Sequence, residues 1–283
     1  MSSPAVEMHS DGRLGDTPNR DYSRKLMLFN AFAQPEIRRC ILNLRLRSGM
    51  HVLDAGCGAG ASLESLQEAV TPAGKVVGVD LSAAHVAAAR AHCPQQIEIV
   101  QADFLNAAFA PASFDLIWCV NTINHLNDPA RGVRHLAGLL RSGGRVALAQ
   151  SSLLPDMVFA WDARLERVTN EAVRRYYRDR YRLEERELTA VRALVGLLRT
   201  AQMTNIAVQT LMIERIAPLD AATESYLSEA IFKNTWGARL RPYLSAEDYA
   251  ELVDLCNPQN PRYALRRPDF HFLQTFTLAT GEV

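Results

Sequence analysis

The residues best suited to chemistry lie in the stretch 52–60, Val-Leu-Asp-Ala-Gly-Cys-Gly-Ala-Gly, where one acidic residue precedes three alternating glycines. Glycine accepts a positive φ and lets a ligand approach the backbone closely. A glycine turn that leads into a helix also offers free N–H groups to a polar ligand. Gly56-x-Gly58-x-x-Ala61 is an allowed form of the dinucleotide fingerprint, and Asp80 follows the next apolar run. These features favour an adenosine-containing cofactor and leave NAD as one alternative.

Two acidic residues, Asp54 in this stretch and Asp103 farther along the chain, argue against a dinucleotide. Asp54 stands two residues before the first glycine, where its charge opposes a phosphate but suits a cationic amine. Asp103 follows a third apolar run, where it is placed to accept a hydrogen bond from an exocyclic adenine amine. Together they favour a cationic adenosine cofactor.

Short apolar runs alternate with helical patterns in the first half of the chain. The expected strands are 50–53, 75–79, 97–100, 114–120 and 145–150, and the expected helices between them are 62–70, 82–91 and 129–140. This alternation is typical of a parallel sheet with helices on both faces. Ligands bind such sheets at the carboxyl ends of the strands, which is where Asp54, Asp80 and Asp103 stand.

Five motifs within about residues 50–150 closely resemble those of the class I S-adenosylmethionine-dependent methyltransferases. They are VLDAGCGAG (52–60), VVGVDLS (76–82), QADF (101–104), FDLIWCVNTINHL (114–126) and LLRSGGRVAL (139–148). The resemblance implies an α/β fold with a doubly wound, Rossmann-like sheet of seven mostly parallel strands. The last strand, expected at 270–279, would be antiparallel, and 205–213 would be the edge strand before it.

The resemblance also implies S-adenosyl-L-methionine as the cofactor and no metal. Asp54, Gly56 and Gly58 are then expected to hold its methionine part. Asp80 is expected to accept hydrogen bonds from both ribose hydroxyls, and Leu81 to pack on the adenine.

Four more positions complete the expected cofactor site. Asp103 contacts the adenine amine and Phe104 lies beside the ring, although Asp103 also suits a turn cap. Asn121, at the end of the fourth strand, is expected near the sulfonium. Tyr22 is the tyrosine that the first helical segment would contribute, with an ordinary helix position as the alternative.

His125 is the candidate catalytic base. It lies just beyond the fourth strand and titrates in a suitable range. Alignment and exclusion of water supply much of the rate of a methyl transfer, but oxygen and carbon nucleophiles usually also need a base. The alternative is that His125 only orders its loop. His271 is a weaker candidate and suits a structural role better.

The patterns also divide the chain. We expect a flexible tail at 1–20 and a cofactor-binding core at 21–152, with two N-terminal helices separated near Pro35. The other expected segments are a helical lid at 153–203, terminal core strands at 204–218 and 270–283, and a helical insertion at 219–269. Both helical segments are rich in aromatic residues and are expected to cover a small-molecule pocket.

Charge and composition limit the partners. Thirty-one Lys plus Arg balance thirty-one Asp plus Glu, so a nucleic acid or an anionic membrane is not expected as a partner. Arginines and tyrosines interleave over 174–186; this cluster suits either a substrate anion or a solvated helix face with ion pairs, and the second interpretation is favoured. The scattered cysteines suggest a reducing compartment.

We therefore expect a soluble, cytoplasmic, bacterial enzyme, because no signal peptide or apolar span is evident. Its expected reaction is methyl transfer to O, N or C of a small, partly apolar or aromatic biosynthetic metabolite, as in natural product biosynthesis. The alternatives are a cyclase-like enzyme that uses the same cofactor without methyl transfer, and an NAD-dependent dehydrogenase. A homodimer is one open possibility.

Overall fold

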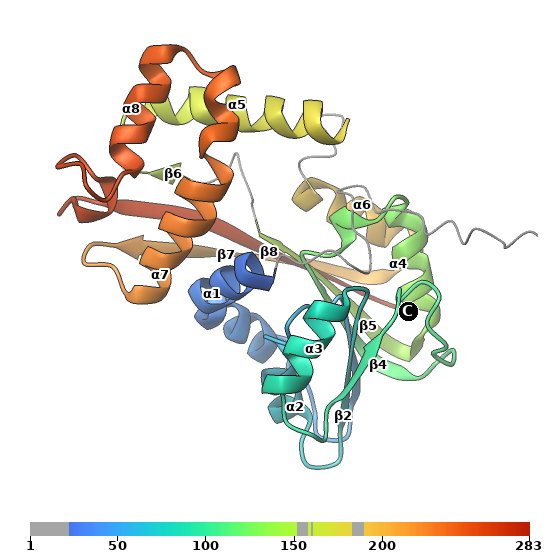
Figure 1. Cartoon of the computed structure of the whole chain (residues 1–283). Helices are drawn as coiled ribbons and strands as arrows, with labels where there is room; N and C mark the ends of the chain where they lie inside the picture. The colour runs from blue at the N-terminus through green and yellow to red at the C-terminus, as the bar shows by residue number, and fades with distance from the viewer. Residues whose placement is uncertain (1–22, 152–157, 160, 183–189) are drawn as a thin grey trace, which may run out of the picture.

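A central sheet with helices on both faces forms the core of the computed structural model, which describes residues 23–151, 158–159, 161–182 and 190–283. The described strands are β1 (His51–Ala55), β2 (Lys75–Asp80), β3 (Glu98–Gln101), β4 (Phe114–Val120), β5 (Leu140–Ser151), β6 (Val158–Phe159), β7 (Thr204–Ile216) and β8 (His271–Glu282). Figure 1 shows a group of helices at the far end of the paired strands β7 and β8.

The strand order is β3-β2-β1-β4-β5-β8, and the first five of these strands run parallel. β8 is antiparallel to β5 and to β7, and the two-residue β6 continues along β8 beyond the end of β5. This arrangement confirms the expected Rossmann-like fold with an antiparallel last strand. β7 and β8 reach well past β5, because their pairing continues to Ile216 and His271.

Two groups of helices cover the sheet. One face packs against α1 (Ser23–Asn43), α2 (Leu63–Val70) and α3 (Ala83–His92). The other packs against α4 (Pro129–Gly138) and α6 (Ala190–Thr200). No helix among the described residues combines the length and the apolarity needed to cross a bilayer.

The N-terminal segment corrects one expectation, because 23–43 is a single helix with Pro35 inside it. Proline removes one helical hydrogen bond and usually ends or kinks a helix. Here Pro35 is on the exposed side, while Phe32 and Ile37 on either side of it are buried against the sheet. We infer that this continuous apolar packing offsets the lost hydrogen bond.

The segment 153–203 also differs from the expected lid. α6, in its second half, is a core helix: Leu194 and Leu198 are at most 1% exposed and pack in the same cluster as Val146 and Leu148 of β5. Of the two helices described in this segment, α5 (Ala163–Tyr181) joins the helices at the far end of the sheet.

We use the name distal cap for α5 together with 219–270. Its further helical elements are α7 (Ala221–Ser225), the π-helix η3 (Tyr226–Thr235), the 3-10 helices η4 (Ala238–Tyr243) and η5 (Ala264–Arg266), and α8 (Ala246–Cys256). Phe232 and Trp236 of the distal cap stack with Phe159 and Trp161, which precede α5 in the chain. The ring centroids are 4.7 Å apart for Phe159 and Trp161, 5.9 Å for Trp161 and Phe232, and 5.6 Å for Phe232 and Trp236. Most of the expected lid aromatics are thus packed against each other.

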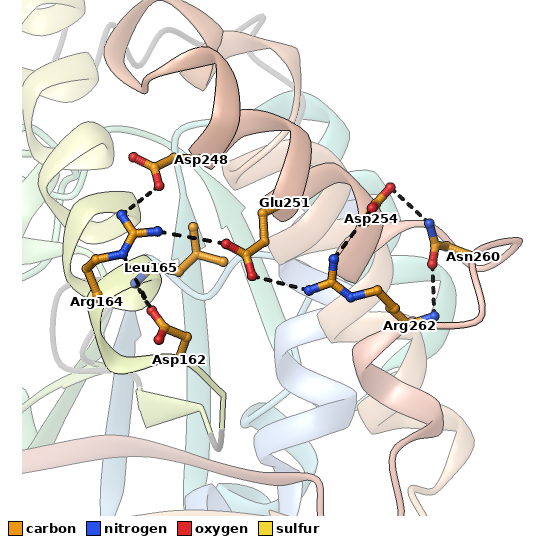
Figure 2. A network of polar contacts seen from close by, with 8 residues as sticks. All are labelled: Asp162, Arg164, Leu165, Asp248, Glu251, Asp254, Asn260 and Arg262. Atoms are coloured by element: carbon orange, nitrogen blue, oxygen red, sulfur yellow. Dashed lines mark hydrogen bonds and ion pairs between the residues drawn. The ribbon is translucent and has the colours of Figure 1, made fainter.

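An ion-pair network joins α5 to α8 on the surface of the distal cap (Figure 2). Arg164 contacts Asp248 at 2.7 Å and Glu251 at 3.8 Å, and Glu251 also accepts a hydrogen bond from Arg262 at 3.2 Å. Since these charges come from separate elements, they tie the cap into one unit. The cap is joined to α1 by Phe32, whose ring stacks on Tyr226 with centroids 4.4 Å apart.

Candidate functional site

A pocket of about 270 Å³ lies at the carboxyl ends of the parallel strands. Its walls include nine of the ten residues predicted from the sequence: Asp54, Gly56, Gly58, Asp80, Leu81, Asp103, Phe104, Asn121 and His125. The tenth, Tyr22, lies outside the described residues. α1 also reaches the pocket, with Leu26, Asn30 and Ile37. The local signals at the strand ends therefore converge on one site, as the parallel topology requires.

The glycine loop after β1 lies directly against the β4 end. Gly56 has a φ of +82°, and a Cβ atom at this position would overlap the side chain of Thr122. The backbone N–H groups of Gly56 and Cys57 both donate to the carbonyl of Val79, at 2.8 and 3.0 Å. Only glycine satisfies both the backbone conformation and this close approach.

Asp80, at the end of β2, has its carboxylate held by three donors. Oδ2 accepts from the backbone N–H of Gly58 at 2.9 Å, and Oδ1 accepts from that of Ser82 at 2.9 Å. Oδ1 also lies 3.2 Å from Nδ1 of His85. His85 was not among the residues predicted from the sequence, although a histidine in the first turn of the helix after an acidic strand end was the available signal.

Asp54 is only 3% exposed in β1. Burial, and secondly the charge of Asp80, raise the pKa of its carboxyl to about 8. Removing an ionised carboxylate from water is costly, so the group retains its proton until a cation compensates it. The site is thus prepared for a positively charged ligand beside Asp54.

Asp103 caps the turn after β3. Its Oδ1 accepts from the backbone N–H of Leu105 at 2.9 Å, and its Oδ2 accepts from the side chain of Asn106 at 2.8 Å. The turn-cap alternative is therefore present in the structure. Each carboxylate oxygen has a second lone pair, so an adenine amine remains a compatible ligand. Phe104 beside it is 6% exposed and contributes an apolar wall.

The end of β4 is tied to the end of β5. Asn121 has a φ of +51°, and its Oδ1 accepts from the backbone N–H of Ser151 at 2.8 Å and from its hydroxyl at 3.0 Å. Thr122 donates to the carbonyl of Val120 at 2.9 Å. These contacts fix the backbone at the floor of the pocket, and they occupy Oδ1, the side-chain amide oxygen of Asn121.

The two candidate histidines lie in different places. His125 ends the short 3-10 helix η1 (Ile123–His125), is partly buried and lines the pocket. His271 lies on β8, where its Nε2 is 2.9 Å from a carboxylate oxygen of Glu214 on β7. His271 is not among the pocket-lining residues, so its geometry agrees with a structural role.

The distal cap does not supply the pocket wall. Within the described ranges, no residue that lines the pocket comes from 153–203 or from 219–269. Residues 153–157 and 183–189 of the expected lid lie outside the described residues, so the lid stays a prediction. The interleaved arginines and tyrosines pack in the cap instead: Arg175 lies 5.4 Å from the ring centre of Tyr243, and Arg239 lies 5.1 Å from that of Tyr176. The i,i+3 ion pair between Arg174 and Glu171, at 3.8 Å, is of the kind that the favoured helix-face interpretation expects. Residues 183–186 of the cluster lie outside the described residues, so that interpretation stays a prediction.

Metal and thiol chemistry receive no support from the part of the chain that the structure describes. No group of three or more His, Cys, Asp or Glu there has an arrangement that could hold a metal ion. Burial raises the pKa of the Cys57 and Cys119 thiols well above the usual value, so both are protonated packing groups.

Comparison with known proteins identifies the central segment. Residues 53–148 match the family model described as a methyltransferase domain. The chain is 32% identical over 117 residues to the 27-O-demethylrifamycin SV methyltransferase of Amycolatopsis mediterranei, covering 40% of this chain and 42% of that one. It is 35% identical over 109 residues to the ubiquinone biosynthesis O-methyltransferase of Coxiella burnetii, covering 35% and 42%. The alignments thus span less than half the length of either relative.

Solved structures show the same fold at low sequence identity. The YcgJ protein of Bacillus subtilis superposes with a TM-score of 0.54 at 17% identity, covering 88% of this chain and 98% of that one. A phosphoethanolamine N-methyltransferase of Haemonchus contortus in complex with S-adenosyl-L-methionine gives 0.51 at 16% identity, covering 91% and 57%. These likenesses support the fold.

Proposed function

We propose that this chain transfers a methyl group from S-adenosylmethionine to a small molecule, because residues 53–148 match the family model described as a methyltransferase domain. One observation carries the proposal: the carboxylate of Asp80 is held at the end of β2 by the N–H groups of Gly58 and Ser82, beside the buried Asp54. Two carboxylates at the glycine loop suit a ligand that carries positive charge and a vicinal diol.

The residues present fit S-adenosylmethionine part by part. Asp54 and the loop glycines Gly56 and Gly58 suit its cationic methionine part. Asp80 lines the pocket, and its Oδ2, which accepts one backbone N–H, has a lone pair left for a ribose hydroxyl. Phe104 and Leu81 give the pocket apolar surface for an adenine. A dinucleotide fits worse, because its phosphates would bring negative charge beside Asp54, whose buried carboxyl ionises only when a cation compensates it.

When bound, S-adenosylmethionine supplies an electrophilic methyl group. The chain's own task is then to hold an acceptor in line with that group and to exclude water. His125 lines the same pocket and serves as the base that removes a proton from the acceptor. Asn121 and Thr122 hold the floor between the glycine loop and the end of β5.

The proposed acceptor is a small, partly apolar or aromatic metabolite of bacterial biosynthesis, methylated on oxygen. The names of the Amycolatopsis and Coxiella relatives both specify oxygen, which favours O over N or C. Balanced charge over the whole chain makes a nucleic-acid substrate a poor match.

Two measurements test the proposal. Calorimetric titration with S-adenosylmethionine, S-adenosylhomocysteine and NAD should show binding of the first two and none of the third. Incubation with phenolic and polyketide-like acceptors should then form S-adenosylhomocysteine together with methylated product. Product formed without S-adenosylhomocysteine would instead indicate a cyclase-like reaction, and tight binding of NAD alone would indicate a dehydrogenase.

A further inference from the structure

A histidine that the proposed mechanism does not use stands against the carboxylate at the end of β2. His85 lies in the first turn of α3, is 2% exposed, and lines the pocket. Its Nδ1 is 3.2 Å from Oδ1 of Asp80. We propose that His85 is a positioning residue that orients Asp80 toward the ribose hydroxyls of the cofactor. This inference rests on the proposed function.

The hydrogen-bond pattern sets the protonation of the ring. A carboxylate only accepts hydrogen bonds, so the ring nitrogen that faces Asp80 carries the hydrogen. A donor to a charged carboxylate makes a stronger bond than a neutral pair does. The other two donors to Asp80 are backbone groups of Gly58 and Ser82, so His85 is the side-chain donor among the contacts that the structure shows.

The start of α3 fixes the position of the ring. Ser82 caps the helix, and its hydroxyl oxygen accepts from the backbone N–H of His85 at 3.4 Å. The same turn therefore places the Ser82 N–H and the His85 ring on one oxygen of Asp80. A change in the position of α3 would move both donors together.

The neighbouring acid shows why a third donor is useful. The charge of Asp80 contributes to the raised pKa of Asp54, so the two carboxyl groups interact when both are ionised. Donors on Asp80 offset that repulsion. The bond from His85 to Oδ1 holds the carboxylate in the orientation that the backbone donors set, in which Oδ2 keeps a lone pair for a ribose hydroxyl.

The experiment compares His85→Leu, which removes the donor at similar size, with His85→Asn, whose amide nitrogen occupies roughly the place of Nδ1. His92→Leu is the matched control, because His92 is at the other end of α3, is exposed, and bonds only locally to the carbonyl of Ala88. The probes are S-adenosylhomocysteine and its 2′,3′-dideoxy analogue, titrated by calorimetry at one pH.

We expect His85→Leu to weaken S-adenosylhomocysteine about tenfold, the loss typical of a hydrogen bond to a charged group. Binding of the dideoxy analogue should change less than about twofold, because it has no hydroxyls for Asp80 to hold. His85→Asn should recover much of the affinity, and His92→Leu should bind both probes as the parent chain does.

Three results would overturn the inference. Equal weakening of both probes would show that His85 only packs, and unchanged affinity would show that it has no role. If the parent chain itself binds no S-adenosylhomocysteine, the proposed function fails together with the inference. In the first two results the parent chain does bind S-adenosylhomocysteine, so the inference alone fails. Thermal unfolding verifies that each variant folds; should His85→Leu not fold, His85→Gln replaces it, because its amide does not reach the position of Nδ1.

Discussion

The side chain of Thr122 fills the space in which a Cβ atom on Gly56 would stand, and its hydroxyl lies 3.4 Å from the Gly56 carbonyl oxygen. The two residues come from the ends of β1 and β4, which are neighbours in the sheet. The glycine loop is therefore shaped by contact with the adjacent strand end as well as by its own backbone preference.

Gly56→Ala should destabilise the chain more than a positive φ alone explains. A left-handed backbone costs an alanine about 1–2 kcal/mol, and Thr122 must also move. Gly143→Ala is the matched control, because Gly143 has a φ of +74° and nothing within 4 Å of its added Cβ. Urea unfolding should show at least about twice the loss of stability for Gly56→Ala. Equal losses would contradict the role of Thr122.

Asp54 predicts a pH-dependent stability. Its pKa is raised to about 8 by burial and, secondly, by Asp80, whereas an unfolded aspartate titrates near 3.9. Between these values the folded state holds a proton that the unfolded state has lost, so stability falls as the pH rises from about 4 to about 8. Urea unfolding at several pH values should show a shallower fall for Asp54→Asn. Parallel pH profiles for the two chains would refute this.

The same carboxyl predicts proton release on cofactor binding. A cationic ligand beside Asp54 favours the ionised form, so below about pH 8 the parent chain should release a proton as S-adenosylmethionine binds. Calorimetry in buffers of different ionisation enthalpy measures this release directly. Asp54→Asn should release less, and an identical release from both chains would remove Asp54 as its source.

His125→Ala should lower turnover by about a hundredfold or more while leaving cofactor affinity nearly unchanged, since general bases contribute factors of this size. The control is His135→Ala, because His135 lies in α4, is partly buried and does not line the pocket. Steady-state rates and S-adenosylhomocysteine titrations separate the two effects. Unchanged turnover in His125→Ala would rule out the base and favour the alternative that His125 only orders its loop.

Arg164→Ala should reduce stability modestly without affecting cofactor binding. Arg164 joins α5 to Asp248 and Glu251 of α8 (Figure 2), and an ion pair made by an exposed arginine adds little to stability because water and salt screen it. High salt should narrow the difference from the parent chain. Arg167→Ala, an exposed position one turn away in α5, is the control. A loss of cofactor affinity would show that the cap communicates with the pocket.

The sheet and its binding edge were predictable because their signals are local. Asp54 and Asp80 each end a short apolar run, and parallel pairing alone brings such ends together. The helices were harder, because their place depends on tertiary contacts. Pro35 predicted a break that the buried side of α1 overrides. α6 is richer in Ala, Val and Leu than the charged α5, but its sequence alone does not show which surface its apolar side covers.

The site was predictable to a similar degree. The carboxylates and the glycines stand in recognisable motifs, whereas the contact of His85 with Asp80 depends on the geometry of the turn that follows β2. Aromatic residues expected over the pocket, such as Trp236 and Phe232, pack against one another in the distal cap, where their rings stack. The sequence alone does not show whether an aromatic ring packs against another ring of the cap or lines the pocket.

The pairing of β7 with β8 gives the distal cap a modular character. Ile216 and His271 are direct partners in the ladder, and the N–H of Ala217 donates to the carbonyl of Phe270 at 3.1 Å. The residues between them therefore leave and re-enter the sheet at hairpin distance. A short turn or a foreign module that replaces the residues between Ile216 and His271 is therefore expected to preserve the strand register, provided that Phe32 of α1 and the side of α5 that contacts α8 are covered again.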